Sequence, residues 1–95
     1  MEEGYRNKKA VAIRYNPEET APKVVATGTG YVAKRMLNKA DEHSIPTYEN
    51  KELVEELLKI NLGDNIPEEL YHAVAQVLAF VAKIDKQAGL KKYGE

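Results

Sequence analysis

The sequence of 95 residues contains no cysteine, which excludes disulfides, thiolate zinc sites, iron–sulfur clusters and cysteine nucleophiles. It also lacks an excess of either charge. Fourteen basic and fifteen acidic residues give a net charge of −1, so we expect no nucleic-acid partner. The longest apolar stretch, 70–84, is interrupted by polar residues and is shorter than a membrane span, so we expect no direct membrane insertion.

The start of the chain, MEEG, is acidic and polar and does not resemble a signal peptide, which predicts a cytoplasmic protein. A chain of this length has room for one domain. We expect a flexible N-terminus over residues 1–9, a single domain over 10–87 and a flexible tail over 88–95.

The first half of the chain predicts strands and one helix. Alternating side chains over 10–15 and β-branched residues within 23–27 predict two strands, and the connection between them suits an antiparallel pair. The period changes to 3.6 at Tyr31, which predicts a helix that ends before Pro46. We expect residues 47–49 to form a short third strand, reached by a right-handed parallel crossover.

Two further helices are predicted after this strand. Asn50 is a good N-cap for the first of them. The last helix is expected to begin near Pro67 and to run to about Gln87, with Gly89 as its C-cap. This order of elements predicts a small α/β domain in which a mixed β-sheet is flanked by helices.

The last helix carries more apolar surface than one contact with a sheet requires. At 100° per residue, its polar side is opposite an obvious core face. Between the two lies an additional strip, either buried by neighbouring elements or open as a docking surface for a partner. The strip consists of Tyr71, Ala75, Leu78 and Ala82.

Residues 28–33 (GTGYVA) match the glycine-rich turn of dinucleotide-binding folds, in which backbone amides approach a pyrophosphate. Gly28, Thr29 and Gly30 therefore define an alternative function, a small nucleotide-binding enzyme or enzyme fragment. A complete dinucleotide domain needs two mononucleotide halves, which this chain cannot supply, and a glycine turn between strand and helix is also common for geometry alone.

No other pattern favours catalysis, a metal or a cofactor. Neither His43 nor His72 has a second histidine at ligand spacing, and Ser44 is the only serine. We therefore expect a protein that is not an enzyme and needs no cofactor.

Five segments, taken together in this order, resemble the cytoplasmic C-terminal domain of the FlhB family of flagellar and type III secretion export-gate proteins. Each segment alone is weak, but the shared order and spacing are specific. The segments are 10–15 (AVAIRY), 21–28 (APKVVATG), 42–46 (EHSIP), 63–71 (GDNIPEELY) and 73–79 (AVAQVLA).

The resemblance implies a non-enzymatic binding module of the protein export apparatus. In the family this domain docks export substrates on an apolar patch that aligns with Ala21, Pro22, Ala75 and Leu78. The implied partners are export-gate membrane proteins and rod- or hook-type substrates, with recruitment to the membrane apparatus. The module would dock export substrates itself or complement the C-terminal part of FlhB.

Family members also carry Asn-Pro-Thr-His before the first strand, where the asparagine cyclises and cleaves its own backbone. Tyr5-Arg6-Asn7-Lys8 occupies the aligned positions, so the resemblance implies no self-cleavage here. The family's sheet includes a strand upstream of that motif, and the residues at that place in this chain are short and polar. We therefore expect strand 10–15 to have an unpaired edge, filled by an upstream strand of FlhB, by a second copy in a weak homodimer or by residues 1–9.

Overall fold

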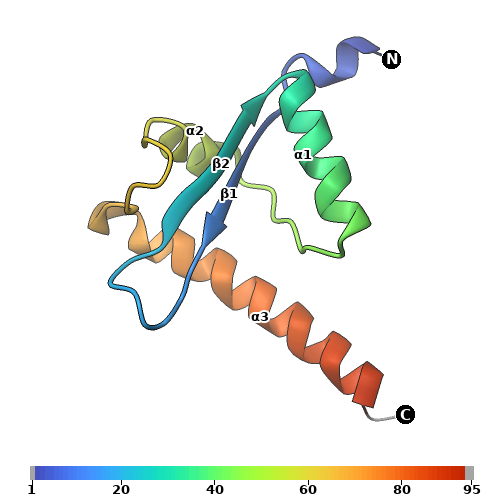
Figure 1. Cartoon of the computed structure of the whole chain (residues 1–95), viewed down its shortest axis with the longest axis vertical. Helices are drawn as coiled ribbons and strands as arrows, with labels where there is room; N and C mark the ends of the chain where they lie inside the picture. The colour runs from blue at the N-terminus through green and yellow to red at the C-terminus, as the bar shows by residue number, and fades with distance from the viewer. Residues whose placement is uncertain (1, 94–95) are drawn as a thin grey trace.

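The computed structural model describes the backbone of residues 2–93 and the side chains of residues 4–83. Among these residues, one β-hairpin is flanked by three α-helices, which confirms the predicted α/β class (Figure 1). The elements are η1 (Glu2–Tyr5), β1 (Lys9–Arg14), β2 (Lys23–Thr29), α1 (Tyr31–Glu42), α2 (Lys51–Leu57), η2 (Glu68–Leu70) and α3 (Tyr71–Tyr93).

Within the described residues the sheet has two strands, β1 and β2, which pair antiparallel from Lys9 opposite Thr29 to Arg14 opposite Lys23. The prediction of a mixed sheet with a third, parallel strand at 47–49 is wrong, because these residues form no strand. The segment instead places the ring of Tyr48 against Phe80 of α3, with 5.0 Å between ring centroids. Three residues with no neighbouring strand to pair with are stabilised more by this aromatic contact than they would be as an isolated strand.

The face of the hairpin that meets α1 is built from small residues. Ala10 is opposite Gly28 and Ala12 is opposite Ala26, and residues two apart on a strand share a face. Ala33 of α1 is fully buried. Small side chains on both elements let the helix backbone approach the strands closely.

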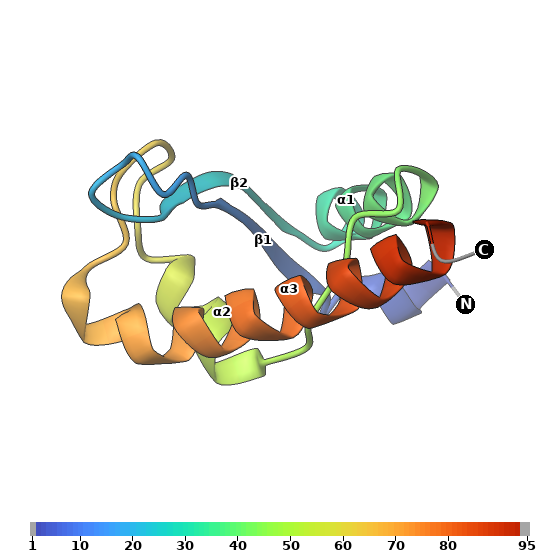
Figure 2. The same cartoon turned by 90° about the horizontal axis from the view of Figure 1, so that it is seen from below.

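The other face of the hairpin meets α2 and α3, which run beneath the strands in Figure 2. Asn50 caps α2 as predicted, because its side chain accepts a hydrogen bond from the Leu53 N–H at 3.0 Å. The buried cluster on this side draws one or two apolar residues from each of four segments, which makes it the main core. Its members are Val24, Leu53, Leu57, Ile66 and Val74.

Helix α3 is longer than predicted and continues through Gly89 to Tyr93, so the expected end at Gln87 and the Gly89 cap are wrong. A glycine within a helix costs only about 1 kcal/mol relative to alanine, and the neighbouring Lys, Leu and Ala residues favour the helix. Figure 1 shows the second half of α3 extending beyond the strands. In the part of the chain that the structure describes, no helix combines the length and the apolar character needed to cross a membrane.

Candidate functional site

The additional apolar strip of α3 is open to solvent over most of its length. Tyr71, Ala75 and Ala82 are exposed, and only Leu78 is half-buried because it also packs against the core. Val74, one residue before Ala75, is 1% exposed. The helix therefore turns one apolar face to the core and leaves a second apolar face accessible to solvent.

The other two residues of the predicted patch, Ala21 and Pro22, lie in a different environment. Ala21 is 3% exposed, and Pro22 is also buried. The Pro22 carbonyl accepts a hydrogen bond from the Ile66 N–H at 2.9 Å, which ties the start of β2 to the segment before η2. These two side chains support the start of β2 and present little surface to a partner.

Two aromatic residues that the sequence did not indicate form a second exposed apolar contact, separate from the strip, because Phe80 lies about 200° around α3 from Leu78. Tyr48 and Phe80 meet edge to face, and they remain 42% and 39% exposed. Because Tyr48 belongs to the segment expected to be a strand, only the observed path of that segment over α3 brings the two rings together.

The space around Gly28, near the end of β2, is filled by atoms of α1. A Cβ atom at Gly28 would lie 2.7 Å from Met36 Sδ and from Val32 Cγ1, and 3.1 Å from the Ala33 nitrogen. Gly30 has φ of 59°, and its N–H donates to the Lys8 carbonyl at 2.8 Å. Close packing of α1 on β2 accounts for the first glycine and a left-handed turn for the second, so the geometry gives no support to a phosphate site.

Strand β1 has an outer edge that no other described strand covers. The Gly30 N–H bond to Lys8 shows that residue 8 faces β2, and alternation then turns the N–H and C=O groups of Val11 and Ile13 outward. Residues 2–5 form the 3-10 helix η1, where Tyr5 packs on Tyr31 of α1, so they do not complete this edge as a strand.

The comparisons with known proteins agree with this architecture. Residues 7–81 match the family model described as the FlhB HrpN YscU SpaS Family. The chain is similar to the uncharacterized protein YlqH of Bacillus subtilis, with 38% identity covering 97% of this chain and 100% of that protein. It is also 45% identical to the flagellar biosynthetic protein FlhB of Helicobacter pylori, covering 87% of this chain and 24% of that protein.

Solved structures show the same fold. The C-terminal domain of PscU is 34% identical, with a TM-score of 0.71, covering 76% of this chain and 94% of that domain. The R313T variant of the EscU/SpaS C-terminal domain is 28% identical, with a TM-score of 0.75, covering 79% of this chain and 95% of that domain. The chain therefore belongs to the FlhB/HrpN/YscU/SpaS family and has the fold of the C-terminal domain of its members.

Proposed function

We propose that this chain is a non-enzymatic docking module of the flagellar or type III protein export apparatus. The observation that carries the proposal is the second apolar face of α3, where Ala75 is exposed and Leu78 is half-buried. A folded domain of this size rarely keeps such a face open without a partner. The partners are rod- or hook-type export substrates, and export-gate membrane proteins recruit the module to the membrane. Ala21 and Pro22 contribute by fixing the segments beside the start of β2.

Changing Ala75 to Asp is expected to weaken the binding of a purified rod or hook subunit by at least about tenfold, because a carboxylate at the interface must lose its water without gaining a partner. Gln76→Asp is the matched control. It adds the same charge at the next exposed position, about 100° away around the helix, and should change the affinity less than about twofold. Isothermal titration calorimetry measures both. Equal affinities for the two variants would contradict docking on this face.

We also propose that the chain does not cleave itself. The aligned turn contains no Asn-Pro, and Lys8 N–H closes it on the Tyr5 carbonyl at 3.0 Å. The Asn-Pro at 16–17 lies in an ordinary turn, where Asn16 Oδ1 accepts a hydrogen bond from the Glu18 N–H. After several days at neutral pH, mass spectrometry should find one intact species. A break near residues 5–9 or after Asn16 would overturn this.

The open edge of β1 provides the means to complement the C-terminal part of FlhB, because outward backbone groups can pair with a strand from another chain. For the dilute protein, the amides of Val11 and Ile13 should exchange with solvent faster than those of Val24 and Ala26. The Val24 N–H is protected because it donates a hydrogen bond to the Asp64 carbonyl, and the Ala26 N–H is protected because it faces β1 in the ladder. Adding a peptide of the FlhB strand upstream of its cleavage motif should protect Val11 and Ile13.

Hydrogen exchange followed by NMR distinguishes the occupants of this edge. Protection that rises with protein concentration in the absence of peptide would identify a homodimer instead. Uniformly slow exchange in a proven monomer would contradict the open edge altogether.

A further inference from the structure

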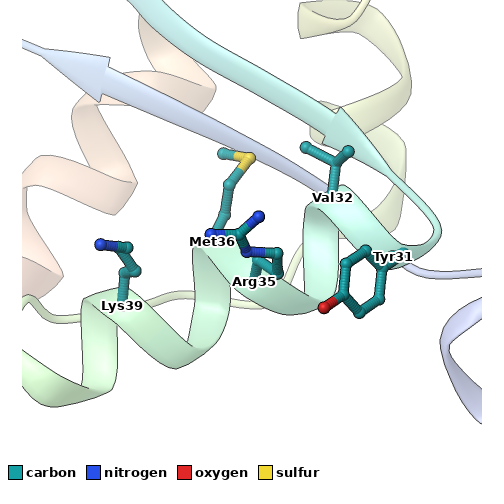
Figure 3. Close-up of a pocket in the computed structure, with 5 residues that line it drawn as sticks. All are labelled: Tyr31, Val32, Arg35, Met36 and Lys39. Carbon is teal, nitrogen blue, oxygen red and sulfur yellow. The ribbon is translucent and has the colours of Figure 1, made fainter.

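Helix α1 carries a shallow groove that none of the preceding arguments uses. Its volume is about 240 Å³, and its lining combines an apolar floor with two cationic side chains (Figure 3). The lining residues, named here the α1 groove, are Tyr31, Val32, Arg35, Met36 and Lys39.

The α1 groove lies on the side of the helix that adjoins β2. Figure 3 shows Val32 and Met36 pointing toward the hairpin, and the short distances from both side chains to a Cβ atom at Gly28 place them against β2. The segment before β1 borders the first turn of the helix, where Tyr5 packs on Tyr31 at one end of the groove and Lys34 lies over the Tyr5 ring at 5.5 Å from its centroid. Val32 remains 52% exposed. The groove therefore opens at the border between α1 and the outer edge of β2.

Within residues 2–93, the outer edge of β2 is covered only at its beginning. The Val24 N–H donates to the Asp64 carbonyl at 3.3 Å, and the Gly63 N–H donates to the Val24 carbonyl at 2.7 Å. The ladder has an irregularity between the Ala26 and Val24 pairs, and beyond it Thr29 and Thr27, which are opposite Lys9 and Val11, alternate with the inward-facing Gly30 and Gly28 and so face outward. Among the described residues, no backbone hydrogen bond outside the hairpin ladder reaches either threonine. A strand-pairing edge thus runs beside the α1 groove.

Charge favours one class of occupant. Arg35 and Lys39 lie one turn apart, and no carboxylate among the described side chains lies within 4.0 Å of either. The only acidic residues of α1 are its last two. Two available cations above an apolar floor complement a ligand that presents carboxylates and apolar side chains together.

We propose that an extended acidic segment of a partner protein binds between β2 and α1. Its backbone pairs with Thr27 and Thr29, its apolar side chains contact Val32 and Met36, and its carboxylates pair with the two cations. Strand addition beside a helix supplies affinity through main-chain hydrogen bonds and specificity through the side chains in the groove. This surface is separate from the α3 strip and from the β1 edge.

The probe is a fluorescein-labelled peptide of seven residues that alternates glutamate with valine or leucine, measured by fluorescence anisotropy. The double variant Arg35→Glu/Lys39→Glu should bind at least about tenfold more weakly. Lys34→Glu/Lys51→Glu, which makes the same change of net charge elsewhere, should change binding less than about threefold. Ala75→Asp should leave it unchanged, which separates this proposal from docking on α3.

A second variant tests the strand pairing. Thr27→Pro removes an outward N–H without removing a ladder bond and should reduce binding about tenfold, whereas Thr27→Val should preserve it. If Thr27→Pro fails to fold by circular dichroism, an N-methylated version of the peptide makes the same test on the wild-type protein.

NMR shift mapping should place the probe along residues 27–39. Mapping to residues 9–14, or equal binding by both charge variants, would overturn the proposal. Peptide binding that is unchanged by both Thr27→Pro and N-methylation would mean that charge alone holds the peptide, without strand pairing, and would also overturn the proposal.

Discussion

Replacing Val74 by Asp is expected to lower the free energy of unfolding by at least about 3 kcal/mol, enough to leave much of the protein unfolded at moderate urea concentrations. Val74 is 1% exposed and belongs to the cluster with Val24, Leu53, Leu57 and Ile66. A carboxylate there would be dehydrated among apolar side chains with no cation to pair with.

The neighbouring residue provides the matched control. Ala75 is exposed, so Ala75→Asp should change the free energy of unfolding by less than about 1 kcal/mol, mostly through helix propensity. Urea denaturation followed by circular dichroism compares the two. If both variants were destabilised equally, the strip of α3 would be buried in solution. That result would contradict the proposed docking surface.

The second large loss of stability that we expect comes from replacing Gly28 by a larger residue. Gly28→Ala should lower the free energy of unfolding by about 1–3 kcal/mol and Gly28→Val by more, because the added atoms collide with the side chains of Val32 and Met36 and crowd the backbone of Ala33. Gly4→Ala is the control, since a Cβ atom there meets no other atom within 4 Å. Combining Gly28→Ala with Met36→Ala should recover part of the loss, because it removes the sulfur atom from the collision.

Gly28 also allows a test between two explanations for this glycine, close packing and nucleotide binding. If Gly28 serves packing, NAD, ATP and FAD should leave the melting temperature of the wild-type protein unchanged. A nucleotide present at 100 times its Kd would stabilise the fold by about 2.7 kcal/mol, which a thermal shift detects readily. A shift that disappears in Gly28→Ala would restore the nucleotide hypothesis.

The sequence alone determined the features that depend on local physical chemistry. The antiparallel pair β1–β2, the start of α1 at Tyr31 and the Asn50 cap follow from side-chain alternation, helical periodicity and capping preference. The apolar excess of α3 was equally visible, because it depends only on 3.6-residue periodicity. The order of the five family segments, which needs no coordinates, indicated the family that the comparisons confirm.

Only the tertiary structure decided which apolar residues are covered. Ala21 and Ala75 are the same residue type, yet the first is buried next to the start of β2 and the second is exposed on α3. The sequence of residues 47–49 favours a strand, but a strand needs a neighbouring strand to pair with. In the fold, Tyr48 packs instead on the ring of Phe80 of α3. The α1 groove likewise depends on which flank of α1 adjoins β2, a relation between distant atoms that no local pattern encodes.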